Sequence, residues 1–248
     1  MPISTEQLVK KTLELGASVA GVTSVESMAD SRSENFVNQH GFYAGDMESA
    51  SKVLVVEQVW RSRAKSLLVF AVAHPRERPE LDWWGKEIAG GTKGNAALID
   101  INKSLVTWLD KFDIQAFDVG YHPLKGGLYV KDAAVLAGLG TVGRNNLFLI
   151  PGLRAHHRLR CLAVAKELEP SQPSLYEPCQ NCAAPCLRAC PQKAFSDQNT
   201  IEEKAFPKGG YKSDLCGLQM QEDKKTAAEK KYPQTRYCRR CEFACTAE

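Results

Sequence analysis

The sequence lacks the features that mark several classes of protein. Its 248 residues contain no apolar run near the roughly 20 residues that a membrane-spanning helix needs. The opening segment MPISTEQLVKKTLELG has no basic stretch followed by an apolar core, so we expect no secretory signal peptide. Opposite charges nearly cancel, with 32 lysines and arginines against 29 aspartates and glutamates, so no global charge favours nucleic acid or a membrane surface. We therefore expect a cytoplasmic protein with no membrane partner.

Internal repeats and low-complexity segments are also missing, which argues against fibrous and disordered classes. The hydrophobic fraction of 44% and the charged fraction of 25% are ordinary for a globular protein of this length. Apolar spacing alternates between helical and extended periods, which predicts an α/β (α+β) domain over residues 1–168. We expect Thr5 to cap the first helix and Gly16 to end it. Helices are expected at 5–15 and 95–112, and strands at 17–25, 66–73, 114–119 and 158–165.

Cysteine is the abundant exception, because eight of the nine cysteines follow residue 178. The ninth, Cys161, lies in an apolar run and is expected to be a buried structural residue. A chain without a secretory signal that concentrates its cysteines in one module usually binds metal. The segment Glu169–Pro178 contains three prolines, which indicates a linker or an extended crossing strand. We predict a second, smaller domain over residues 169–248 that is held together by what its cysteines bind.

The cysteine spacing points to iron–sulfur clusters. A Cys-Pro pair, here Cys190-Pro191, ends the cysteine run of bacterial ferredoxins, where the last cysteine binds the other cluster. We expect Cys190 to begin a helix, with Pro191 in its first turn. The pattern predicts a bacterial-ferredoxin-like module with two [4Fe–4S] clusters, and two zinc sites are the alternative. One cluster would be bound by Cys179, Cys182, Cys186 and Cys245, and the other by Cys190, Cys216, Cys238 and Cys241.

A glycine-rich block, DAAVLAGLGTVGRNN, covers residues 132–146. A short helix at 133–137 is expected to end at Gly138, and Gly140 and Gly143 allow a tight turn before a strand at 147–150. No convincing strand precedes the glycines, so a dinucleotide fingerprint is not expected. No Gly-Lys-Ser/Thr follows them either, so the block does not predict a phosphate-binding Walker loop.

Two blocks together resemble a known superfamily. AGLGTVGRNNLFLIP at 137–151 and CQNCAAPCLRACPQKAF at 179–195 resemble the epoxyqueuosine reductase and reductive dehalogenase superfamily. The resemblance implies a nitroreductase-like domain that binds cobalamin, joined to a module whose two clusters pass electrons to the cobalt. A flavin in the same pocket is the alternative cofactor. The implied cofactor contacts are Gly138, Leu139, Gly140, Gly143, Arg144 and Asn145.

Reduction of a substrate also needs a proton donor. Tyr121 and His122 in the turn GYHPLKGG are candidates, and a plain surface turn is the alternative reading. Asp132 is a third candidate, although an aspartate at the start of a helix is first of all an N-cap. The resemblance implies an acidic donor well upstream of the AGLG block, whereas Asp132 lies five residues before Ala137.

The resulting hypothesis is an iron–sulfur, cobalamin-dependent reductase of a small-molecule substrate. The alternative is an electron-transfer protein that reduces a partner, such as a corrinoid protein, because the chain is much shorter than the full-length reductases. The segment Gln221–Arg240 carries seven basic and three acidic residues. It can dock an acidic electron donor such as a ferredoxin or flavodoxin, or approach an RNA backbone such as that of tRNA, and a solvated loop is the plain alternative.

Overall fold

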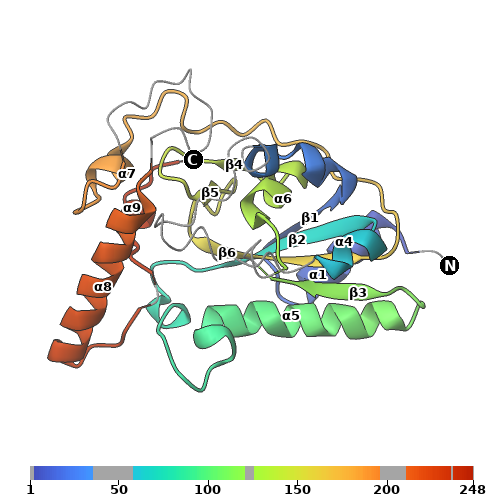
Figure 1. Cartoon of the computed structure of the whole chain (residues 1–248), viewed down its shortest axis with the longest axis horizontal. Helices are drawn as coiled ribbons and strands as arrows, with labels where there is room; N and C mark the ends of the chain where they lie inside the picture. The colour runs from blue at the N-terminus through green and yellow to red at the C-terminus, as the bar shows by residue number, and fades with distance from the viewer. Residues whose placement is uncertain (1–2, 36–57, 121–125, 196–210, 236, 248) are drawn as a thin grey trace. The chain divides into compact units, whose positions relative to one another are not determined.

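The computed structural model describes residues 3–35, 58–120, 126–195, 211–235 and 237–247 (Figure 1). The chain divides into two compact units, and each unit combines segments that are distant in the sequence. The division after residue 168 that the sequence suggests stays a prediction. The first unit comprises Met1–Ala73, Ala97–Gly140 and Arg158–Leu175, and the second comprises His74–Ala96, Thr141–His157 and Tyr176–Glu248.

The first unit is built on a four-stranded sheet with the strand order β1-β2-β6-β3. β1 and β2 pair antiparallel, as do β3 and β6. The first six residues of β2 are buried, which fits an apolar run in an inner strand. The predicted mixture of helices and strands is thereby confirmed. The strands are β1 (Val19–Ser24), β2 (Ser66–Ala73), β3 (Ala116–Val119) and β6 (His157–Val164).

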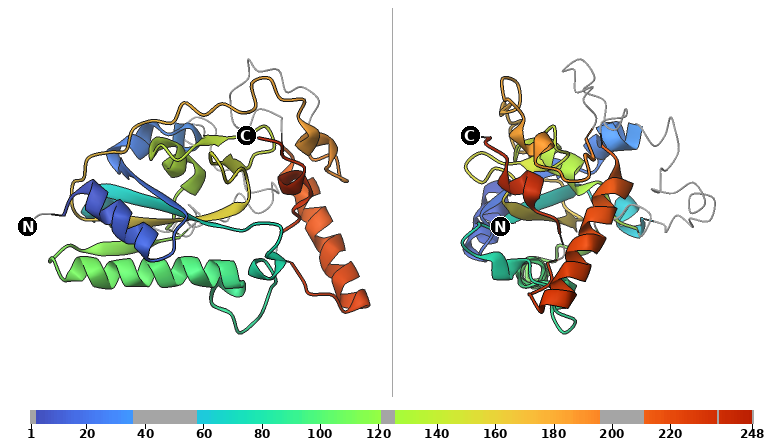
Figure 2. Two further views of the ribbon diagram at one scale, coloured as in Figure 1. Left: turned by 180° about the vertical axis from the view of Figure 1, so that it is seen from behind. Right: turned by 90° about the vertical axis from the view of Figure 1, so that its left-hand side faces the viewer.

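Helices cover both faces of this sheet. On one face α1 (Thr5–Glu14) and α5 (Lys93–Asp110) contribute buried leucines to a core that includes Leu68 and Phe70 of β2. α5 runs alongside β3 in both Figure 1 and the left view of Figure 2. On the other face α6 (Val130–Leu136) approaches Gly21 of β1 closely. A side-chain carbon on Gly21 would lie 2.3 Å from the Ala137 carbonyl oxygen, so this contact requires glycine.

The cap of α1 differs from the expectation. Ser4, not Thr5, is the N-cap, and its Oγ accepts a hydrogen bond from the Gln7 N–H at 3.2 Å. The Gln7 side chain in turn accepts a hydrogen bond from the Ser4 N–H at 2.9 Å. This reciprocal capping box satisfies two backbone donors, which explains why the helix begins one residue after Ser4. Gly16, with φ of 107°, follows the end of the helix as predicted.

The second unit has short elements and a small apolar core. Its buried cluster consists of Leu149, Ala155, Ala247 and two cysteines, Cys186 and Cys245. No described helix is both long and apolar enough to cross a bilayer. Its elements are η2 (Pro79–Leu81), η3 (Ala89–Gly91), β4 (Thr141–Val142), β5 (Phe148–Leu149), α7 (Pro185–Arg188), α8 (Ser213–Lys230) and α9 (Arg240–Phe243); the first unit adds η1 (Glu26–Asp30) and α4 (Val59–Arg63).

Candidate functional site

The first cysteine run folds around α7. Ala184 adopts a left-handed conformation with φ of 52°, and Pro185 then opens the helix that holds Cys186. The helix ends before Cys190, whose sulfur accepts a hydrogen bond from the Ala194 N–H at 3.4 Å. The predicted helix beginning at Cys190 is therefore wrong, because Pro185 rather than Pro191 supplies the helix-opening proline.

Four of the cysteines form what we call the first cysteine set: Cys179, Cys182, Cys186 and Cys245. Burial raises the pKa of the Cys186 thiol to about 11, and the other three members add to the rise. Burial also raises the pKa of Cys245, with further contributions from Cys179 and Cys182. The Cys182 sulfur accepts a hydrogen bond from the Ala184 N–H at 3.4 Å. Cys186 and Cys245 also belong to one buried cluster, against which Cys179 packs, so these thiols form one local group.

The remaining four cysteines line a single pocket, and we call them the second cysteine set: Cys190, Cys216, Cys238 and Cys241. Burial raises the pKa of Cys241 to about 12, and all three other members add to the rise. Cys186 of the first set contributes as well, which shows that the two sets adjoin. The pocket is completed by Pro191, Ala194, Phe195, Gln219 and Arg240.

The donor sets fit iron–sulfur clusters chemically. Each set offers four thiols, the number that ligates a [4Fe–4S] cluster. Thiols with a raised pKa are protonated at neutral pH, so metal binding must displace protons from them. Among the described residues, no group of three or more histidine, cysteine or carboxylate side chains is arranged so that it could hold a single metal ion.

The second set also receives side-chain hydrogen bonds at its sulfurs. Arg240 donates from Nη1 to the Cys238 sulfur at 3.3 Å. Asp223 on α8 accepts two hydrogen bonds from the same guanidinium, at 2.9 and 3.0 Å, and these raise the pKa of Arg240. Tyr211 is hydrogen-bonded to Cys216, and burial followed by this bond raises the pKa of the phenol. These contacts were not predicted, because they join residues of no recognisable sequence motif.

The glycine block ends α6 as expected. Gly138 has φ of 71°, and the N–H groups of Gly138 and Leu139 bond to the Val135 and Ala134 carbonyls at 3.0 Å. This is a Schellman-type helix end, for which glycine is the usual residue. A side-chain carbon on Gly138 would lie 2.0 Å from the Gln172 carbonyl oxygen, so the position also needs glycine for close packing. The cofactor-binding role of Gly138, Leu139 and Gly140 stays a prediction.

The end of the glycine block contacts both cysteine runs. Arg144 donates from Nη1 to the Cys182 carbonyl oxygen at 3.2 Å, and Asn145 donates from Nδ2 to the Cys241 carbonyl oxygen at 3.4 Å. Within the turn, the Gly143 N–H bonds to the Leu147 carbonyl at 2.8 Å. Arg144 has five N–H donors and uses one in this bond, so others can still serve a ligand. The cofactor contacts at Gly143, Arg144 and Asn145 remain predictions.

Asp132 has a structural partner in the first unit. Its carboxylate accepts hydrogen bonds from the Ser33 N–H at 2.7 Å and the Ser33 hydroxyl at 3.0 Å. The N-cap of α6 is Tyr129, so the N-cap interpretation of Asp132 is wrong. Tyr121 and His122 lie outside the described residues. The role of all three as proton donors stays a prediction.

Lys131, next to Asp132, is a titratable residue that the sequence analysis missed. Burial lowers the pKa of its ammonium group to about 8, against the opposing effect of Asp132. Burial raises the pKa of nearby Tyr129 to about 12, and the charges of Asp132 and Glu34 add to the rise. A lysine whose pKa is near neutrality can exchange a proton under physiological conditions. Its sequence position carried no signal, because only burial makes it unusual.

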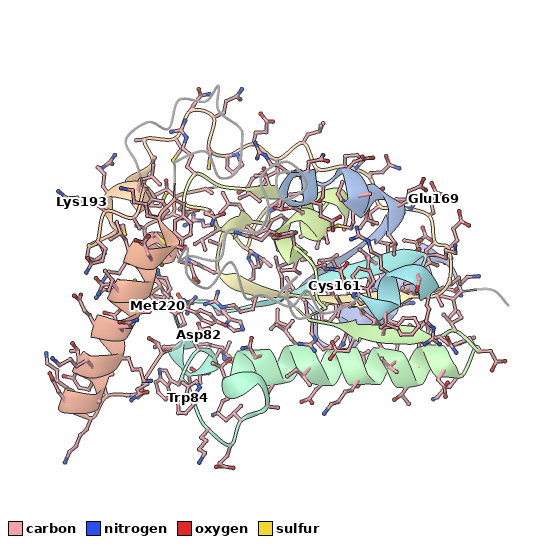
Figure 3. The ribbon with its side chains drawn as sticks, viewed as in Figure 1. Asp82, Trp84, Cys161, Glu169, Lys193 and Met220 are labelled. Atoms are coloured by element: carbon pink, nitrogen blue, oxygen red, sulfur yellow. The ribbon has the colours of Figure 1, made fainter. Side chains whose placement is uncertain are left out.

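The second unit also holds a buried charged network that the sequence analysis missed. Arg239 bonds from Nη1 to Asp82 at 2.6 Å, from Nη2 to the His74 carbonyl at 2.6 Å and from Nε to Glu242 at 3.0 Å. Asp82 also contacts His74 Nδ1 at 3.0 Å. All four residues are less than 10% exposed. Figure 3 labels Asp82 in the segment between β2 and α5. Arg239 thus fixes the backbone between two cysteines of the second set.

Cys161, also labelled in Figure 3, is confirmed as a buried residue of β6. It is 2% exposed, and burial raises the pKa of its thiol strongly. A thiol held protonated in this way is a poor nucleophile and a poor metal ligand. The ninth cysteine therefore plays no part in the two cysteine sets.

No protein-family model matches the chain, and no curated protein is similar to it in sequence. Solved structures do share its fold. The epoxyqueuosine reductase of Streptococcus thermophilus has a TM-score of 0.63 at 20% identity, over 98% of this chain and 65% of that one. An epoxyqueuosine reductase solved with a modified tRNA stem loop has a TM-score of 0.65 at 19% identity, over 98% and 64%.

Reductive dehalogenases show a weaker likeness. One of them, described with a mechanism for B12-dependent dehalogenation, has a TM-score of 0.53 at 18% identity, over 76% of this chain and 25% of that chain. The chain spans about 65% of the length of the epoxyqueuosine reductase that it matches. Identities this low establish the fold and not the activity. The predicted resemblance is therefore confirmed at the level of architecture: the chain is built on the fold that epoxyqueuosine reductases and reductive dehalogenases share.

Proposed function

We propose that the chain is an iron–sulfur reductase that delivers electrons to a corrinoid and, through it, to a small substrate. The observation that carries the proposal is the grouping of eight cysteines into two adjoining sets of four. When bound, two [4Fe–4S] clusters would supply one electron each, and a corrinoid would supply a strongly reducing metal. The shared fold with epoxyqueuosine reductases and a B12-dependent dehalogenase supports the corrinoid.

Some residues of the chain would bind the clusters, and others would position the segments that carry the cluster ligands. The two cysteine sets would ligate the clusters, and Arg144 and Asn145 would hold the two cysteine runs in place through the Cys182 and Cys241 carbonyls. Arg144 keeps further N–H donors for the amide or phosphate groups of a corrinoid. An acidic electron donor such as ferredoxin or flavodoxin would dock on the exposed lysines of α8, which include Lys224, Lys225 and Lys230.

The first experiment is chemical analysis and absorption spectroscopy of the anaerobically purified chain. We expect iron and sulfide in amounts that account for two clusters, and a broad absorption near about 400 nm that dithionite bleaches. Addition of cob(II)alamin should then shift the corrinoid bands. Zinc in place of iron would refute the proposal. If the chain holds the clusters but binds neither cobalamin nor another corrinoid, the part of the proposal that concerns the corrinoid is refuted.

An electron carrier for a partner protein is the second candidate. It is favoured by one observation, namely that the carboxylate of Asp132, a candidate proton donor, is already bonded to the N–H and the hydroxyl of Ser33. A carrier would form a stoichiometric complex with a corrinoid protein and reduce it, without turning over a substrate alone. Turnover of a small substrate by the isolated, cluster-loaded chain would exclude this candidate.

A further inference from the structure

The sulfurs of the two cysteine sets have different hydrogen-bond partners. In the first set Cys182 accepts a bond from a backbone N–H and lies 3.7 Å from the Thr246 hydroxyl. In the second set Cys190 also accepts a backbone N–H bond, but Cys238 and Cys216 contact a guanidinium and a phenol. The second set thus has a positively charged side-chain donor in direct contact with a ligand sulfur.

The guanidinium is held firmly in position. Asp223 binds both terminal nitrogens of Arg240, so the planar group has one favoured orientation, and Nη1 remains aimed at the Cys238 sulfur. Asp223 is stabilised in turn by Gln219 of the same helix, whose Nε2 donates to it at 2.9 Å. Burial opposes the ionised form of Asp223, but the bonds from Arg240 and Gln219 outweigh it and lower the pKa of the carboxyl.

The phenol is held by a second contact. The Tyr211 ring stacks on Phe195, with 5.6 Å between the ring centroids and an interplanar angle of 30°. The Lys212 N–H bonds to the Ala194 carbonyl at 2.8 Å and fixes the backbone beside the tyrosine. Both Phe195 and Ala194 line the pocket of the second set. These contacts hold the Tyr211 ring and its backbone beside residues of that pocket.

The arginine described beside the first set bonds to a backbone oxygen. Arg144 donates to the Cys182 carbonyl oxygen at 3.2 Å. Donors and positive charge at a ligand sulfur stabilise the reduced, more negative state of a cluster and so raise its reduction potential. The structure assigns the higher reduction potential to the second cysteine set, with Arg240 and Tyr211 as the residues that set it. This inference rests on the proposed function.

An electron shared between the two sites would then reside at the second set at equilibrium. Its transfer oxidises the first site by one electron and reduces the second by one, and no proton or bond is involved. A cluster at the second set would thus hold the electron at equilibrium, whichever partner supplies it.

The test is a redox titration of the anaerobic, cluster-loaded full chain, followed by electron paramagnetic resonance. We expect two separate midpoint potentials in the unaltered chain. Arg240→Gln should lower the higher one, changing the oxidised-to-reduced ratio at fixed potential about tenfold, or about 59 mV for one electron. Arg240→Lys should restore part of the shift, because it keeps the charge. Tyr211→Phe should lower the same midpoint by less, because it removes a neutral donor.

Arg78→Gln is the matched control, because Arg78 also pairs with a carboxylate, that of Glu80 at 3.0 Å, and among the described residues its side chain bonds to no cysteine. It should leave both midpoints unchanged. The inference is overturned if the chain holds two clusters but Arg240→Gln and Tyr211→Phe leave both midpoint potentials unchanged. It is also overturned if these variants shift the lower midpoint instead. Either result would leave the proposed function intact. A chain without two clusters would overturn both. If Arg240→Gln fails to hold its clusters, Arg240→Lys and Tyr211→Phe decide the question.

Discussion

The two units of the chain are stabilised in different ways. The first buries aliphatic side chains of α1, α5 and the sheet in one continuous core. The second has a buried cluster of five residues, two of them cysteines, together with the buried charged network around Arg239. Apolar burial needs no ligand, whereas buried thiols and charges gain much of their stability from their partners. The first unit should therefore fold by itself more readily than the second.

Removal of the clusters should cause the largest loss of stability, and this loss should be confined to the second unit. We expect chelation of iron from the full chain to unfold much of 176–195 and 211–247, while β1, β2 and β6 stay protected. Metal binding that contributes to folding can be worth on the order of 10 kcal/mol in small domains. Hydrogen exchange with mass spectrometry measures both units at once. Equal loss of protection in the two units would contradict the comparison.

Replacement of Arg239, the arginine of the buried network, should cause the second-largest loss of stability. Arg239→Met leaves the carboxylates of Asp82 and Glu242 buried without their cation, which should cost about 3–5 kcal/mol. Urea denaturation, monitored separately for each unit, should show the loss in the second unit. The matched control is Arg78→Met, which breaks an exposed ion pair and should cost less than about 1 kcal/mol. Similar losses for the two variants would show that the network adds little.

A comparison of two glycines, Gly138 of the first unit and Gly152 of the second, separates the cost of backbone strain from the cost of close packing. Gly138→Ala places a left-handed alanine 2.0 Å from a carbonyl oxygen, so we expect a loss of about 3 kcal/mol or more. Gly152 has a similar φ of 74° but nothing within 4 Å, so Gly152→Ala should cost only about 1–2 kcal/mol. Thermal unfolding of both variants gives the difference. Equal costs would mean that the chain relaxes around Gly138.

The last expected effect is a change in how stability depends on pH, and it concerns Lys131. Because its pKa falls from 10.5 to about 8 in the folded state, the unfolded chain binds more protons between these values. The penalty for burying the charge is present below pH 8 and is relieved as the pH rises toward 10.5. Lys131→Met should therefore flatten the rise in stability over this range. Lys11→Met, which removes the lysine of a surface pair with Glu14, should keep the rise.

The sequence predicted the first unit better than the second. The strand at 66–73 matches β2, and the helix expected at 95–112 is α5 at Lys93–Asp110. Both follow from periodic apolar residues, a local signal that survives folding. The Ser4 cap was missed even though the spacing of Ser4 and Gln7 fits a capping box, because Thr5 is an equally good cap by residue type.

The contacts of the second unit depend on residues that are far apart in the chain. Asp82 and Arg239 meet across more than 150 positions, and neither lies in a periodic pattern. The start of α7 was misplaced because two prolines, Pro185 and Pro191, both follow the rule for a first helical turn. The candidate cysteines could be named from spacing alone, but the sulfur contacts of Arg240 and Tyr211 could not.

The hydrogen bonds from residues 144 and 145 to the two cysteine runs have a consequence for tracing relatives. A glycine block that braces both runs through their backbone carbonyls does not depend on the side chains around those cysteines. Arg239 and Arg240 have contacts of their own, but the brace places no demand on the other side chains between the cysteines. A search pattern that joins the two blocks across a gap of variable length should find distant members that overall sequence identity misses.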